Sequence, residues 1–268
     1  LSSDHQTVPR ENIDAIRRAD AAGICVCICT GRMLEDASDF ITSLQLPCMI
    51  IACNGTRISD GPLPKGHILY RRSFEPQDAK RVLDLVLPYR IMINGFEDGR
   101  VNTVAFAPDQ HYHLTDRGLI DASYGEKAIY EAAQRGIMKF YISADGYAGA
   151  NTSKHIEDAR KAIKSAFPEL QITQSAPGNI EIMPKDANKG TALAFLAQSL
   201  DFKREQVMAM GDAENDLSML EYAYHSVAMA NGTEKIKSVC RYQTMSNDEC
   251  GVAKMIDRVL EVMESQNE

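Results

Sequence analysis

Short apolar runs alternate, near both ends of the chain, with longer segments in which apolar residues recur every three or four positions. The runs have the length of buried strands and occupy residues 24–29, 48–52, 207–210 and 226–229. The periodic segments have the pattern of amphipathic helices, as in residues 34–44, 189–200 and 251–264. Strands and helices in alternation predict an α/β fold, with a Rossmann-like, doubly wound core built on a parallel sheet.

The middle of the chain follows a different pattern, because its predicted strands come in pairs. Predicted helices separate these pairs at residues 76–87, 122–135 and 152–166. Paired strands with helices between them are typical of an α+β domain, here with an antiparallel sheet. We therefore predict that a cap of residues 76–182 is inserted into a discontinuous core of residues 1–75 and 183–268.

Polar residues follow the apolar run that ends at Gly211. Asp212 stands at the carboxyl end of this predicted strand, and Asn215 and Asp216 come within the next turn. Ligands of open α/β sheets bind beyond the carboxyl ends of the strands. Two carboxylates and an amide suit a hard cation such as Mg²⁺. The alternative is a plain turn in which Asp212 caps the following helix.

Two other predicted strand and helix ends carry groups suited to a phosphate. Thr30 and Gly31 place a hydroxyl and backbone N–H groups beside a helix N-terminus, although threonine is also common there as a simple cap. Lys189 begins a helix, where the helix dipole disfavours a cation unless an anion lies nearby, although a solvated surface lysine is the alternative. Together with Asp212, these residues predict a phosphate site beside a metal site.

Several segments now show a family resemblance that spans nearly the whole chain. They are residues 28–32, 51–55, 188–190, 211–216, 227–232 and 247–253. In this order they resemble motifs of the haloacid dehalogenase-like phosphatases, and specifically of the Cof-type branch with a large α/β cap. The segment Gly211 to Asp216 is the most specific of them. The resemblance implies Mg²⁺-dependent hydrolysis of small phosphorylated metabolites (sugar phosphates, nucleotides or cofactor phosphates) through an aspartyl-phosphate intermediate.

The same resemblance implies roles for individual residues. Thr30 and Lys189 are the catalytic residues that the chain contains, Thr30 binding the transferring phosphoryl group and Lys189 neutralising its charge. Asp212 binds Mg²⁺, and Asp216 is either a further ligand or a group that orients the ligands. The residues expected to bind phosphate or substrate beside Thr30 and Lys189 are Gly31, Arg32, Asn54, Gly55 and Asn215.

One motif of the family is missing from the sequence. The resemblance implies an Asp-x-Asp-Gly-Thr segment at the end of the first strand, and residues 4–7 (DHQT) replace it poorly because no apolar run precedes them. We expect the nucleophilic aspartate just upstream of Leu1 in a longer native chain, and no turnover by residues 1–268 alone. The alternatives are a phosphomutase of the same superfamily and an inactive relative that binds a phosphorylated ligand.

Composition narrows the class of protein and its partners. A net charge of −8 argues against a general nucleic-acid binder, but a local cation and a few bases still permit an anionic substrate. Seven cysteines without zinc-site spacing are typical of a reducing cytoplasm. No apolar run is long enough to cross a bilayer, so we expect no membrane partner. Tyr141, Asp145 and Tyr147 either line the substrate pocket or form an ordinary loop, and nothing indicates an oligomeric state.

Overall fold

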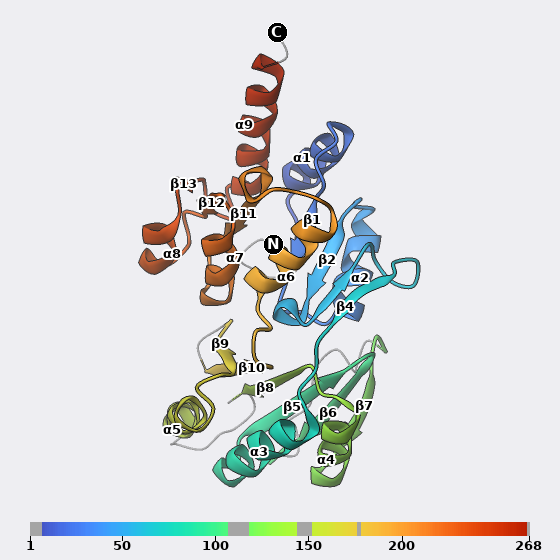
Figure 1. The fold of residues 1–268 in the computed structure, drawn as a ribbon, viewed down its shortest axis with the longest axis vertical. Coiled ribbons are helices and arrows are strands. Elements are labelled where there is room, and N and C mark those ends of the chain that lie inside the picture. The colour runs from blue at the N-terminus through green and yellow to red at the C-terminus, as the bar shows by residue number, and fades with distance from the viewer. Residues whose placement is uncertain (1–6, 107–117, 144–151, 176–177, 267–268) are drawn as a thin grey trace.

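The computed structural model describes residues 7–106, 118–143, 152–175 and 178–266. Figure 1 shows a core, formed by both ends of the chain, above a second α/β unit formed by its middle part. We call this second unit the cap; it contains every helix and strand from α3 to β10. None of the helices within these described ranges is long and apolar enough to cross a membrane.

The first core sheet has four strands in the order β1-β2-β3-β4. They are β1 (Cys27–Cys29), β2 (Met49–Ala52), β3 (Arg57–Ser59) and β4 (Ile68–Arg71). Helix α2 (Leu34–Leu44) connects β1 to β2, and these two strands are parallel, as predicted. Strands β3 and β4 continue the sheet in antiparallel pairing, because a short turn follows β2 where a helical crossover would be needed for a parallel strand.

The second core sheet has three parallel strands in the order β11-β12-β13. They are β11 (Met208–Gly211), β12 (His225–Ala228) and β13 (Tyr242–Gln243). Helices α7 (Leu217–Tyr222) and α8 (Glu234–Val239) form the crossovers between them. This is the α/β alternation expected from the apolar runs in this part of the sequence.

Strands β1 and β11 lie at facing edges of the two core sheets. Within the described chain, β1 pairs only with β2 and β11 only with β12. Their side chains nevertheless share hydrophobic clusters, since Ile28 packs with Met210 and Cys29 packs with Ala209. The expectation of a fully buried central strand at residues 24–29 was wrong, because β1 is shorter and partly exposed. In the described chain β1 is an edge strand, and an edge strand has no neighbouring strand to shield one of its sides.

Three helices complete the core. They are α1 (Arg10–Ala21), α6 (Lys189–Ser199) and α9 (Gly251–Ser265). Helix α1 packs on α9 through Ala15, Ile16 and Ala19, which lie on one helical face, against Ala253 and Ile256. This packing joins the two ends of the chain, as Figure 1 shows, and makes the core discontinuous in sequence.

The cap contains a six-stranded sheet in the order β7-β6-β5-β8-β10-β9. Its strands are β5 (Met92–Glu97), β6 (Arg100–Val104), β7 (Asp121–Tyr124), β8 (Lys139–Ser143), β9 (Gln171–Thr173) and β10 (Asn179–Met183). The predicted antiparallel sheet needs a correction, because β6 and β7 are parallel. The predicted helix at 122–135 also begins later: Gly125, with φ of 92°, turns the chain from β7 into α4 (Glu126–Arg135).

One face of the cap sheet is covered by helices α3 (Pro76–Val86), α4 and α5 (Thr152–Ala166). Phe140, Ile142, Ile180 and Ile182 point to this side and form its hydrophobic core with the helices. Because neighbouring residues of a strand point to opposite faces, Lys139 and Glu181 point the other way, toward the core. The cap therefore presents charged side chains to the part of the core where the strands end.

Candidate active site

Four loops of the core meet beyond the carboxyl ends of β1, β2 and β11 and the start of α6. A side chain on Gly31 would place its Cβ 3.0 Å from Asn54 Oδ1 and 3.6 Å from Asn215 Nδ2. Gly55, with φ of 99°, lies so close to α6 that a Cβ would be 2.2 Å from the carbonyl oxygen of Asn188. These contacts explain why glycine stands at both predicted positions, and they bring the predicted residues into one place.

Thr30 is fixed at the end of β1 by its backbone. Its N–H donates to the Ile51 carbonyl oxygen at 2.8 Å, and its carbonyl oxygen accepts from the Asn54 N–H at 3.0 Å. The hydroxyl accepts a hydrogen bond from the Arg32 N–H at 3.1 Å. A hydroxyl that accepts in this way keeps its own proton for donation to a ligand oxygen. Thr30 therefore has the geometry to donate a hydrogen bond to a bound phosphate oxygen.

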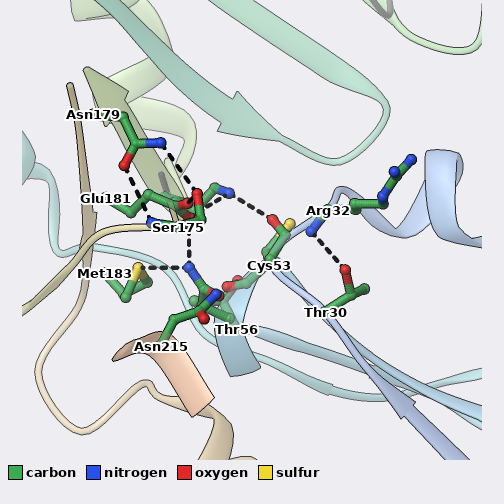
Figure 2. Close-up of polar contacts among 12 residues, drawn as sticks. Thr30, Arg32, Cys53, Thr56, Ser175, Asn179, Glu181, Met183 and Asn215 are labelled. Carbon is green, nitrogen blue, oxygen red and sulfur yellow. Dashed lines mark hydrogen bonds and ion pairs between the residues drawn. The ribbon is translucent and has the colours of Figure 1, made fainter. Parts of the chain in front are cut away.

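Arg32 contributes its backbone to this loop, whereas its side chain points elsewhere. The guanidinium donates to Asp36 Oδ2 at 2.9 Å and lies 5.8 Å from the centre of the Phe40 ring. Figure 2 shows the side chain extending away from the contacts around Glu181. Phosphate binding by Arg32 stays a prediction, and it requires either the backbone or a different side-chain direction.

Lys189 is the first residue of α6, and its ammonium is buried. Its Nζ donates to Asp216 Oδ1 at 2.6 Å, with only 5% of the side chain exposed. Burial opposes the charge, but the Asp216 carboxylate outweighs burial and raises the pKa of Lys189. Burial raises the pKa of the Cys29 thiol to about 12, and the Lys189 ammonium partly opposes this rise. Because Cys29 precedes Thr30, the ammonium lies near the Thr30 loop.

Asp216 organises the loop that follows β11. Its Oδ2 accepts from the backbone N–H groups of Asp212 at 3.0 Å and Ala213 at 3.1 Å, while Oδ1 accepts from Lys189. A Cβ on Gly211 would lie 2.6 Å from the Asp216 Cβ, so only glycine fits there. Of the two roles considered for Asp216, these contacts favour the one that orients Asp212.

Asp212 lies half-buried at the end of β11, where its carboxylate borders the site. Its Oδ2 accepts from Asn231 Nδ2 at 2.6 Å. A carboxylate in this place fits a hard cation such as Mg²⁺. The described residues bring no three histidine, cysteine or acidic side chains together in a way that could hold a metal ion, so metal binding by Asp212 stays a prediction. Asn231 was not predicted, although its place directly after the predicted strand at 226–229 is the same signal that identified Asp212.

Asn54 and Asn215 link the core loops to the cap. Asn215 Nδ2 donates to Asn54 Oδ1 at 3.2 Å, and Asn54 Nδ2 donates to Glu181 Oε2 at 2.5 Å (Figure 2). Asn54 holds a left-handed conformation with φ of 55°, which asparagine adopts more readily than most residues. The amides of both residues already bond protein groups, so their expected role in substrate binding stays a prediction.

Lys139 and Glu181 are site neighbours that the sequence reading missed. Lys139 Nζ donates to the Gly31 carbonyl oxygen at 2.6 Å and to Glu181 Oε2 at 3.0 Å. Burial would raise the pKa of Glu181, but the charge of Lys139 and hydrogen bonds from Ser175 and Asn54 lower it. A signal was available in the sequence, because Lys139 and Glu181 each interrupt a run of apolar residues in a predicted strand. Charged residues are rarely buried in such a run without a partner.

A cavity of about 190 Å³ opens between the core and the cap beside Lys189. Its cap side is formed by the strand β9, and its core side includes Asn188, Lys189 and Asn215. Tyr141, which was considered for the pocket lining, packs instead with Met33 and Cys53 where cap and core meet. Asp145 and Tyr147, the other two candidates, lie outside the described residues, as does Asp4.

Comparison with known proteins agrees with this geometry. Residues 1–256 match the sequence profile of the family described as haloacid dehalogenase-like hydrolase. The chain belongs to this family. The matches place it in the Cof-type phosphatase branch and so confirm the resemblance drawn from the motifs. They also confirm the predicted α/β fold class.

Three similar proteins from Bacillus subtilis illustrate the match. The 5-amino-6-(5-phospho-D-ribitylamino)uracil phosphatase YwtE is 32% identical over 97% of this chain and 94% of its own length. The phosphatase YcsE, named for the same substrate, is 32% identical over 96% of this chain and 90% of its own. A solved haloacid dehalogenase-like hydrolase superposes with a TM-score of 0.81 at 27% identity, covering 96% of this chain and 95% of the other.

Proposed function

We propose that this hydrolase is a Mg²⁺-dependent phosphatase of small phosphorylated metabolites. The observation that carries the proposal is the set of hydrogen bonds that joins the three loops: Asp216 bonds both the Lys189 ammonium and the Asp212 N–H, and Asn215 bonds Asn54, whose own N–H donates to the Thr30 carbonyl oxygen. Phosphoryl transfer is accelerated mainly by positioning and by stabilising charge on the transferring group. The Thr30 hydroxyl, the Lys189 ammonium and the Asp212 carboxylate supply a hydrogen-bond donor, a fixed positive charge and an oxygen ligand for the metal.

Each of these residues has a defined part in the proposed reaction. Thr30 donates a hydrogen bond from its hydroxyl to a phosphoryl oxygen, and Lys189, held by Asp216, offsets negative charge beside it. Asp212 would hold the metal, and Asp216 fixes the backbone of Asp212. Bound Mg²⁺ would supply further neutralisation of charge on the phosphoryl oxygens. An aspartate nucleophile completes the proposed reaction, as the aspartyl-phosphate route requires.

The relatives suggest a first substrate for testing. YwtE and YcsE are both named for 5-amino-6-(5-phospho-D-ribitylamino)uracil, and we propose the same compound as the leading candidate here. Sugar phosphates, nucleotides and cofactor phosphates complete the panel. The cap forms the wall opposite Lys189, so we propose that it selects among these leaving groups and excludes water when a substrate is bound.

The test measures phosphate release from p-nitrophenyl phosphate and from the substrate panel, with Mg²⁺ and with EDTA. We expect metal-dependent turnover that falls by about 100-fold or more in Asp212→Asn, because the metal loses its carboxylate ligand. Asp201→Asn makes the same chemical change at an exposed position and should keep wild-type activity. Turnover that ignores Mg²⁺, or an Asp212→Asn variant with full activity, would contradict the proposal. Transfer of phosphate to a second sugar hydroxyl would indicate a phosphomutase.

A further inference from the structure

A buried pair of opposite charges on the cap contacts the core beside the candidate site. The side chains of Lys139 and Glu181 are 4% and 3% exposed, and they come from the neighbouring strands β8 and β10. Two charges are costly to remove from water unless further hydrogen bonds satisfy them. Here the further partners include atoms of the core, so the pair is satisfied only while the cap rests on the core.

The core atoms that complete the pair belong to the predicted phosphate loop and to its neighbour. Lys139 reaches the carbonyl oxygen of Gly31, the central residue between Thr30 and Arg32. Glu181 accepts from the side chain of Asn54. Lys139 also lies 5.0 Å from the centre of the Phe96 ring, which restricts where its ammonium can move.

Two backbone hydrogen bonds join the two core segments that Lys139 and Glu181 contact. The Asn54 N–H donates to the Thr30 carbonyl oxygen at 3.0 Å, and the Cys53 N–H donates to the Arg32 carbonyl oxygen at 2.8 Å. The loop from Thr30 to Arg32 is therefore held on one side by the residues that follow β2 and on the other by Lys139. Release of the Gly31 carbonyl would free the peptide that carries the Arg32 N–H.

We propose that Lys139 and Glu181 are positioning residues of the phosphate loop. The docked cap fixes the Gly31 carbonyl through Lys139 and the Asn54 side chain through Glu181, so the Thr30 hydroxyl is correctly placed only when the cap is docked. The importance of this for catalysis rests on the proposed phosphatase function. The geometric part, that a cap lysine orders a core loop, is independent of it.

A second contact between cap and core allows docking and positioning to be separated. Asp98, in the turn between β5 and β6, pairs with Arg57 at 3.2 Å and with Arg71 at 3.0 Å. Glu35 joins the same contact by accepting from Arg57 at 2.7 Å and from the Gly99 N–H at 3.1 Å. None of these bonds reaches the Thr30 loop, so Asp98→Ala weakens docking without removing a bond to that loop.

The main experiment compares amide hydrogen exchange in the wild type, Lys139→Met and Asp98→Ala. The reporters are the amides of Arg32, Cys53 and Asn54, because all three are bonded within the loop pair. We expect their exchange to rise at least about tenfold in Lys139→Met, as local opening becomes more frequent. In Asp98→Ala their exchange should rise clearly less than in Lys139→Met, because Lys139 still bonds the Gly31 carbonyl oxygen whenever the cap is docked.

The double variant Lys139→Met with Glu181→Met guards against a folding defect in the single variant. It removes both charges together, and replacement of a buried ion pair by apolar residues is often tolerated. We expect it to fold and to show the same faster exchange at Arg32, Cys53 and Asn54. Wild-type protection of these amides in the double variant would overturn the proposal. Failure of the double variant to fold would overturn it too, because the pair would then serve mainly the stability of the cap.

Kinetics with p-nitrophenyl phosphate supply the second readout. If the loop still binds the substrate but holds it in the wrong place, kcat falls more than KM rises. We therefore expect a loss of about 100-fold in kcat for the double variant. Asp98→Ala should lower kcat clearly less than the double variant does, because Lys139 and Glu181 still hold the loop whenever the cap is docked. An unchanged kcat in the double variant would overturn the catalytic part of the proposal. If the wild type itself hydrolyses no phosphate ester, the proposed function fails, and hydrogen exchange still decides whether Lys139 orders the loop.

Discussion

Two buried ion pairs define the chemistry of the site at the scale of single residues. Lys189 bonds Asp216 inside the core, and Lys139 bonds Glu181 at the contact between cap and core. Burial by itself disfavours each charge, yet the partners raise the pKa of Lys189 and lower the pKa of Glu181. Lys189 and Glu181 therefore stay charged at neutral pH, and the charged form of each is stabilised by its partner.

The lowered pKa of Glu181 predicts a loss of stability in acid. Its folded-state pKa lies below the ordinary value of 4.5, so the ionised carboxylate stabilises the fold fully above that value. This contribution disappears as the pH falls through the lowered pKa. Urea unfolding between about pH 7 and about pH 3 should show a shallower acid loss for Glu181→Gln than for the wild type.

The glutamine variant has a second expected property. It should already be less stable than the wild type at neutral pH, because Lys139 keeps a buried charge without its carboxylate partner. Glu169→Gln, at an exposed position, serves as the control and should follow the wild-type curve. An acid loss in Glu181→Gln as steep as that of the wild type would show that Glu181 does not titrate in this way.

Helix α6 carries the site at the scale of elements, because its start fixes Lys189. Asn188 caps the helix: its Oδ1 accepts from the Thr191 N–H at 2.9 Å, and its own N–H donates to Thr191 Oγ1 at 3.1 Å. This reciprocal pair makes Lys189 the first helical residue. The next residue, Gly190, packs against α7, the helix that follows Asp216, and so sets the distance between Lys189 and its partner.

A methyl group at position 190 should disturb this packing. In Gly190→Ala the new Cβ would lie 2.3 Å from the Ser218 carbonyl oxygen and 2.6 Å from its carbon, so α7 has to move. We expect a destabilisation of roughly 1–3 kcal/mol, as for overpacked sites in general, together with reduced phosphatase activity. Thermal unfolding followed by circular dichroism measures the first effect.

Gly61→Ala is the matched control for this variant. Its Cβ would have its nearest neighbour at 3.8 Å, which is ordinary contact distance, and no backbone strain opposes the change. Its melting temperature should stay within about a degree or two of the wild type. If both alanine variants melt alike, close packing of α6 on α7 does not determine the stability of the site.

At the scale of the whole molecule, two of the polar contacts that hold the cap against the core lie well apart. One is the Lys139–Glu181 pair beside the phosphate loop, and the other joins Asp98 to Arg57 and Arg71. The chain passes between the two units after β4 and again after β10, as Figure 1 shows. We propose that the domain boundaries lie there, with residues 76–182 as the cap and residues 1–75 and 183–268 as the core.

Removal of the Asp98 contact should loosen the connection without unfolding either unit. In Asp98→Ala, Arg71 loses its carboxylate partner and Arg57 keeps only Glu35, while Arg71 at the end of β4 and Arg72 just after it lie exposed. We expect trypsin to cleave there several-fold faster than in the wild type, because proteolysis follows local opening. Mass spectrometry of the fragments locates the cut.

Asp121→Ala is the control, since Asp121 pairs with Arg100 inside the cap sheet and not across the contact. It should be cleaved between β4 and α3 at the wild-type rate. Equal cleavage of the two variants would mean that Asp98 does not contribute to docking.

Helices and site loops were accessible to sequence reasoning because their signals are local. The periodic segments gave α2, α5, α6 and α9 to within one or two residues, and the motifs located the loops at Thr30, Lys189 and Asp212. Reliance on local signals also explains why the strand at Asp121–Tyr124 was missed. Its residues resemble the start of a helix, and only pairing with β6 makes them a strand.

The sequence by itself determined the fold class and the family and predicted the central site residues, because these depend on local periodicity and on short motifs. The tertiary structure decided which atoms meet. Lys139 is separated by 108 residues from the Gly31 carbonyl that it bonds, and Asn54 by 127 residues from Glu181. No local pattern encodes such distances, since they depend on how the cap packs on the core. The structure also directs the Arg32 side chain to Asp36 and leaves β1 at a sheet edge of the described chain.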